Sequence, residues 1–131
     1  MQTWDIMRAV QWLLEEEKLS PATISVYGKG DMGVIALYAA LLDERVNQVI
    51  LNDPPASHWT GPALLNVLRV TDIPEVAAAL APRKVFSLTK LPDSLEYGAR
   101  VYRLEAASKQ FAQSGSLAEA LEVWRIPASI R

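Results

Sequence analysis

The sequence predicts an α/β fold, a parallel sheet of about four strands with connecting helices. Two observations lead to this prediction. Strand-like and helix-like segments alternate along the chain, and the predicted strands are apolar on both faces, as is typical of parallel strands buried between helices. The chain has 131 residues, enough for one domain with a substantial core. We therefore expect a single α/β domain over residues 1–131.

The first half of the chain is predicted to alternate helix, strand, helix and strand. Between Thr3 and Lys18, apolar side chains recur every three or four residues, which indicates a helix with one buried face that Thr3 caps. A β-rich stretch at 23–28 lies between turn residues and predicts a strand. An apolar helix over 32–43 and a second strand over 46–53 follow.

The second half is predicted to continue this alternation after a proline-rich loop. Asp72 is a good N-cap for one helix, and Asp93 is a good N-cap for a longer helix that reaches about residue 110. The remaining expected elements are a helical stretch over 63–69, the helix that Asp72 caps over 73–80, a third strand over 84–89, and a short helix leading to a last strand over 121–126.

Composition excludes several classes of function. A net charge of −2 gives no electrostatic reason to expect nucleic acid or an anionic membrane as a partner, and no apolar run approaches the ~20 residues that span a bilayer. The absence of cysteine excludes thiolate metal sites and thiol nucleophiles. His58 is the only histidine, so a general base or metal ligand of that type has one candidate. We expect neither metal nor cofactor, and the sequence leaves the cellular compartment open.

A glycine-rich turn, GKGDMG, lies between the first predicted strand and the following helix. Gly28, Gly30 and Gly33 match G-x-G-x-x-G, and Asp53 follows twenty residues later, at the end of the next strand. A dinucleotide-binding fold places its pyrophosphate-binding glycines and its ribose-binding acid in this way. The same glycines also suit any tight turn from a strand to a helix, and here a full helix precedes the strand. Dinucleotide binding is therefore one alternative for this turn.

A second interpretation of the turn involves nearly the whole chain. The helix before the first strand has the pattern W-D-x-x-R-A-x-x-W-L at residues 4–13, and Leu-Ala-Pro-Arg at 80–83 precedes a later strand. With these motifs the chain resembles the C-terminal half of an α/β-hydrolase, in particular the acetyl xylan esterase and dienelactone-hydrolase-like branches. In that family a G-x-nucleophile-x-G elbow follows the strand. The resemblance places the nucleophile position at Gly30, where glycine offers no nucleophile.

The resemblance leaves only partial candidates for a catalytic triad. A shift of one residue would make Asp31 the nucleophile. Asp93 lies near the position of the family's acid, although it also suits a helix cap. No histidine follows the last predicted strand. His58 is then either a displaced general base or a structural residue. Without a general base, a serine or aspartate nucleophile would lack activation or turnover.

The resemblance also implies that the first half of the hydrolase sheet is missing. One face of the sheet and the free edge of the strand at 23–28 would then be uncovered, and exposed edges favour pairing. We expect a homo-oligomer, most simply a dimer, or a complex with a separate N-terminal half. Three functions follow: a non-catalytic domain acting through assembly or binding, a weak or assembled carboxylesterase, and a dinucleotide-binding module.

Overall fold

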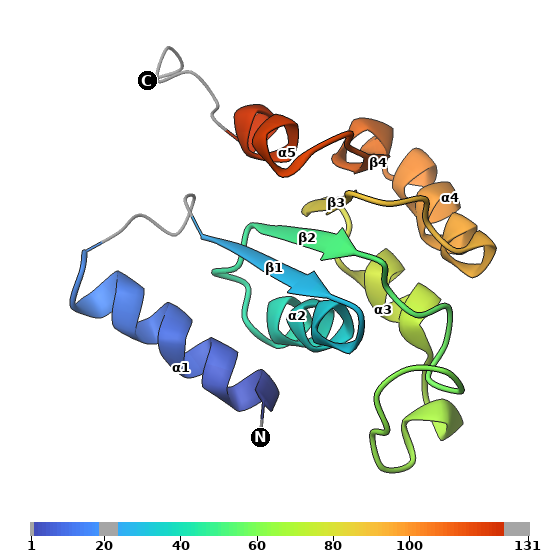
Figure 1. The fold of residues 1–131 in the computed structure, drawn as a ribbon, viewed down its shortest axis with the longest axis horizontal. Coiled ribbons are helices and arrows are strands. Elements are labelled where there is room, and N and C mark those ends of the chain that lie inside the picture. The colour runs from blue at the N-terminus through green and yellow to red at the C-terminus, as the bar shows by residue number, and fades with distance from the viewer. Residues whose placement is uncertain (1, 19–23, 125–131) are drawn as a thin grey trace.

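The computed structural model describes residues 2–18 and 24–124, and these residues build one four-stranded parallel sheet (Figure 1). The strands lie side by side in chain order and are β1 (Ser25–Lys29), β2 (Gln48–Asn52), β3 (Lys84–Ser87) and β4 (Phe111–Gln113). Every neighbouring pair is parallel. The predicted α/β fold class is confirmed.

Helices separate the strands along the chain. The α-helices are α1 (Gln2–Glu15), α2 (Asp31–Leu42), α3 (Ile73–Ala79), α4 (Glu96–Leu104) and α5 (Leu117–Trp124), and short 3-10 turns are η2 (Val67–Arg69), η3 (Asp93–Leu95) and η4 (Ser108–Gln110). Helices α2, α3 and α4 connect consecutive parallel strands, and right-handed crossovers place such helices on one face of a sheet. Helix α1 packs beside α2 at the β1 side of the molecule (Figure 1).

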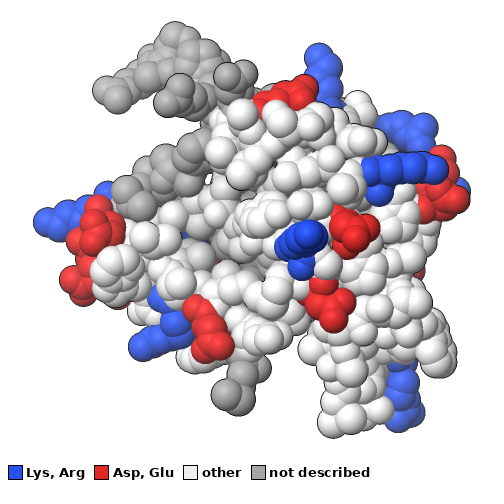
Figure 2. Space-filling view, in the orientation of Figure 1, with Lys and Arg blue, Asp and Glu red and all other residues white. Residues whose placement is uncertain are grey.

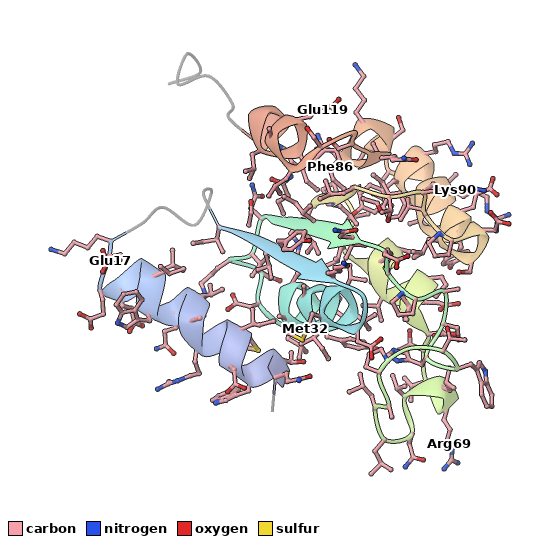
Figure 3. All side chains as sticks on the ribbon, in the orientation of Figure 1. Glu17, Met32, Arg69, Phe86, Lys90 and Glu119 are labelled. Carbon is pink, nitrogen blue, oxygen red and sulfur yellow. The ribbon has the colours of Figure 1, made fainter. Side chains whose placement is uncertain are left out.

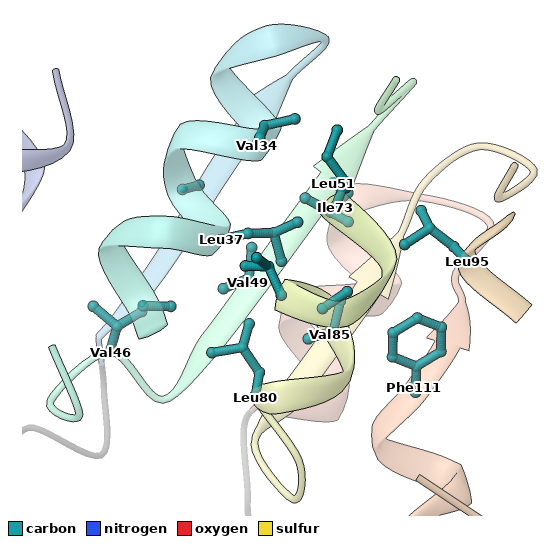
Figure 4. Packing of buried hydrophobic residues seen from close by; sticks show 14 of the residues in the cluster. Val34, Leu37, Val46, Val49, Leu51, Ile73, Leu80, Val85, Leu95 and Phe111 are labelled. Carbon is teal, nitrogen blue, oxygen red and sulfur yellow. The ribbon is translucent and has the colours of Figure 1, made fainter. Parts of the chain in front are cut away.

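The main core lies between this helical layer and the sheet (Figure 4). Leu37 of α2, Val49 and Leu51 of β2, and Val85 of β3 are almost fully buried there. Helix α2 is apolar on all sides, and this agrees with its position among α1, α3 and the sheet. The burial of both faces of β2 agrees with its continuous apolar sequence.

The second face of the sheet is partly covered, which corrects the expectation that it would be bare. Ala120 of α5 packs against Ile50 and Phe86, and Figure 3 shows Phe86 between β3 and α5. The Gln48 amide donates a hydrogen bond to the Ala120 carbonyl at 3.3 Å. The cover does not extend over β1, where Tyr27 is 48% exposed. Among the described residues, this face is therefore open at β1.

The last strand was predicted in the wrong place. Residues 121–124 belong to helix α5, whereas residues 125 and 126 lie outside the described part of the chain. The fourth strand is instead Phe111–Gln113, which directly follows the stretch expected to be the long helix. Phe111 is buried against Tyr102 of α4, with ring centroids 5.0 Å apart, so a tertiary contact fixes this short strand.

Two predicted helices are shorter than expected. The stretch 63–69 contains only the turn η2, because Asn66 adopts a left-handed conformation (φ 59°) that interrupts a helix. The long helix expected from Asp93 divides into η3, α4 and η4, and Ala106 (φ 55°) marks the break after α4. The Asp93 side chain caps neither η3 nor α4. Helix α1 begins at Gln2, so Thr3 lies inside it and is not its cap.

Candidate functional site

The glycine turn after β1 forms a sharp corner into α2. Gly30 has φ 55° and ψ −130°, a conformation that side-chain-bearing residues rarely adopt. A Cβ atom at Gly30 would meet no other atom within 4 Å, whereas a Cβ at Gly28 would lie 2.4 Å from the Met32 carbonyl oxygen. Gly28 is thus required by close packing of strand and helix. Gly30 faces open space and contributes no functional group.

Two backbone N–H groups of this turn are used within the protein. The Gly30 N–H donates to the Asn52 carbonyl at 2.8 Å, and the Gly33 N–H donates to the Gly30 carbonyl at 3.0 Å. A bound pyrophosphate would need such N–H groups free. The Asp53 carboxylate is exposed at the end of β2, where the dinucleotide interpretation expects the ribose-binding acid. The turn therefore offers fewer anion donors than its glycines suggest.

His58 lies in the loop between β2 and α3, and its side chain is buried. Its Nδ1 atom lies 2.9 Å from the Pro62 carbonyl oxygen, which can only accept a hydrogen bond, so Nδ1 carries the proton. In the neutral ring Nε2 is then an acceptor, and the Tyr38 hydroxyl donates to it at 3.0 Å. Both ring nitrogens are engaged: the Nδ1 contact lies within the loop, and the Nε2 contact fixes the loop to α2.

Asp72 organises the same loop, a role that the sequence did not reveal. As predicted, Asp72 caps α3, and its carboxylate accepts from the Ile73 N–H at 2.8 Å within a capping box with Glu75. The carboxylate also accepts from the His58 N–H at 2.8 Å and from the Ser57 hydroxyl. These contacts join residues 14 and 15 positions apart, so no local pattern could have shown them.

The electrostatics of this cluster follow from its contacts. Burial disfavours the charged form of Asp72, but hydrogen bonds from Ser57, His58 and Ile73 outweigh burial and lower the pKa of Asp72. Burial, together with the negative charges of Asp72 and Glu75, raises the pKa of Tyr38. Asp72 therefore stays ionised and Tyr38 stays protonated around neutral pH, as the hydrogen bonds require.

Ser57, His58 and Asp72 do not form a catalytic triad. In a triad the imidazole lies between the hydroxyl and the carboxylate and passes a proton. Here the Ser57 hydroxyl donates directly to Asp72, and the His58 ring bonds to Tyr38 and Pro62 instead. The geometry is that of a structural network without a positioned nucleophile.

The three residues considered for catalysis lie on separate segments after three different strands. Asp31 is exposed at the first turn of α2, and Asp93 is exposed in η3, 3.9 Å from the Lys90 ammonium. No hydrogen bond or ion pair joins any two of Asp31, His58 and Asp93. Within residues 2–18 and 24–124, no three acidic or histidine side chains gather as a metal site would require, and no helix is long and apolar enough to cross a bilayer.

Comparison with known proteins returned no match to any family model, curated protein or solved structure. The hydrolase resemblance therefore depends on the residues of this chain alone.

Proposed function

We propose that this chain is a non-catalytic, α/β-hydrolase-like domain that acts through self-association at the free edge of β1. The observation behind the non-catalytic part is the elbow-like turn at Gly30. The turn has the sharp strand-to-helix geometry that presents a nucleophile in hydrolases, but its central residue has no side chain. The hydrogen bonds that occupy both ring nitrogens of His58 also argue against a displaced general base.

The self-association part is supported by the unpaired edge of β1. The Ile24 carbonyl accepts from the Asn47 N–H at 3.0 Å, so its backbone faces β2. Because alternate residues of a strand point to opposite sides, the backbone groups of Ser25, Tyr27 and Lys29 face away from β2. In the described part of the chain no strand pairs with that edge. Such an edge is a template for another strand.

A second copy fits this edge without a clash of charges. If two β1 strands pair antiparallel about a twofold axis at Tyr27, Lys29 lies opposite Ser25 of the second copy rather than opposite a like charge. Helix α1 lies on the same side of the molecule (Figure 1) and exposes Trp4 (62%) and Trp12 (53%). Their eight-residue spacing places both on one helix face, where a dimer would bury them.

The test compares two substitutions at one position. Tyr27→Pro removes the outward N–H and leaves the β2 ladder intact, because Tyr27 does not bond to β2 through its backbone. Tyr27→Thr removes the same side chain but keeps the N–H. By light scattering after size-exclusion chromatography, we expect dimers for the wild type and Tyr27→Thr, and a folded monomer for Tyr27→Pro. A monomeric wild type would refute self-association.

The non-catalytic part has its own test. We expect the wild-type chain to hydrolyse a short-chain aryl ester no faster than a heat-unfolded sample. Turnover that Asp31→Asn or His58→Ala abolishes would instead support the esterase alternative, and saturable NAD binding that is lost in Gly30→Val would support the dinucleotide alternative.

A further inference from the structure

The segment between Asp53 and Asp72 extends away from the sheet and ends in the turn η2 (Figure 1). Arg69 is the only charged residue between these two aspartates. In Figure 2 the projecting part of the molecule is white apart from a blue side chain, which lies where Figure 3 labels Arg69. Three apolar side chains there are largely solvent-exposed: Trp59 (82%), Leu65 (96%) and Val70 (87%). This concentration of exposed apolar surface is unusual for a region without a ligand or partner.

A groove of about 400 Å³ lies within this segment. Its apolar lining comes mainly from Trp59, Leu64, Val67 and Leu68, and Arg69 lies at the same groove. The volume is in the range of pockets that take small organic ligands, roughly 300–1,000 Å³. His58, Asn66 and Arg69 are the polar residues of the lining, and an apolar pocket with a small number of polar groups is the usual composition of such a site.

One wall of the groove is held in place before any ligand arrives. His58 lines the groove, and its ring is fixed by Tyr38 and Pro62 while its backbone N–H is fixed by Asp72. The turn η2 also lines the groove, and the Val70 N–H after it donates to the Val67 carbonyl at 2.8 Å. Because hydrogen bonds already order these residues, binding a ligand costs less conformational entropy.

The charge of Arg69 specifies the ligand. Its guanidinium forms no ion pair or side-chain hydrogen bond with any residue in the described ranges, so its five donors are available. A guanidinium matches a carboxylate with two parallel hydrogen bonds. We propose that this groove binds a small amphipathic carboxylate, with the carboxylate at Arg69 and the apolar body between Trp59 and Leu68. The proposal concerns a different surface from the β1 edge.

The experiment is an NMR titration of the 131-residue chain with hexanoate, observing the indole N–H signals of the four tryptophans. Trp59→Phe identifies the Trp59 signal. We expect this signal to shift and saturate while those of Trp4 and Trp12 stay in place. Arg69→Gln should weaken binding at least tenfold because it removes the charge and retains a polar side chain. Arg103→Gln, an exposed arginine of α4, is the matched control and should bind as the wild type does.

A neutral ligand of the same length tests whether binding depends on the carboxylate or only on contact with apolar surface. 1-Hexanol should bind at least tenfold more weakly than hexanoate. Equal binding of both compounds, or equal hexanoate binding by Arg69→Gln and wild type, would overturn the proposal and indicate a surface for a protein or lipid partner. The oligomeric state of Arg69→Gln should equal that of the wild type, so a failure here is distinguishable from a failure at the β1 edge.

Discussion

The Tyr38 hydroxyl and the His58 Nε2 atom lie 3.0 Å apart, and their hydrogen bond joins α2 to the loop after β2. This contact uses the ring nitrogen that a general base would need. It also fixes the orientation of the only imidazole of the chain, whose other ring nitrogen lies at the Pro62 carbonyl. The geometry thus favours a structural role for His58 and guides the first prediction.

Restoring a hydroxyl at the elbow should not restore esterase activity. We expect Gly30→Ser to hydrolyse p-nitrophenyl acetate at the rate of Gly30→Ala, because His58 is held by Tyr38 and an unactivated serine is a poor nucleophile. The comparison with Gly30→Ala controls for the changed backbone. Turnover by Gly30→Ser that His58→Ala removes would show that the imidazole can reach this turn and would contradict the structural assignment.

The two glycines of the turn should differ in their sensitivity to substitution. Gly28→Ala places a Cβ 2.4 Å from a backbone oxygen, so strand and helix must separate. We expect it to destabilise the fold by at least ~3 kcal/mol, in the range of severe core defects. Gly30→Ala meets no atom but must adopt a positive φ, which costs about 1–3 kcal/mol. Urea unfolding measures both. Equal losses would show that close packing does not decide the role of Gly28.

The charge of Asp72 should make stability depend on pH. Its pKa is lowered in the folded state, so the stabilisation is present above the unfolded pKa of ~3.9 and is lost as the pH falls through the folded pKa. Asp72→Asn keeps a capping side chain but removes the charge. We expect it to be about 1 kcal/mol less stable than wild type at pH 7, and this difference should shrink below pH ~4. Urea unfolding across this range is the measurement. A difference that does not change with pH would contradict the assignment.

Tyr102 should give the opposite dependence at high pH. Its hydroxyl is buried and donates to the Arg83 carbonyl at 2.6 Å, and burial raises its pKa. The stabilisation is present below the unfolded pKa of ~10 and is lost as the pH rises above it. We expect Tyr102→Phe to cost about 1 kcal/mol at pH 7 and less at pH ~11. The half-exposed Tyr97 provides the control, since Tyr97→Phe should change little at either pH.

The sequence was most informative where local chemistry determines structure. The strand, turn and helix around Gly28 and Gly33 were predicted because tight strand-to-helix corners need glycine. The prediction that Asp72 caps a helix is also confirmed, because capping involves residues that are close in the chain. The cap predicted at Asp93 was wrong, because residues before α4 form a 3-10 turn with no side-chain cap.

The sequence was sufficient to predict the α/β class, the first three strands and the absence of a side chain at Gly30. The other features could not be predicted, because they depend on contacts between residues that are distant in the chain. Phe111 belongs to a strand because it packs on Tyr102 and pairs with β3, and α5 covers the second face because Ala120 meets Ile50 and Phe86. The network at Asp72 and the groove at Arg69 likewise arise from folding of the loop after β2, and no periodicity in the sequence encodes them.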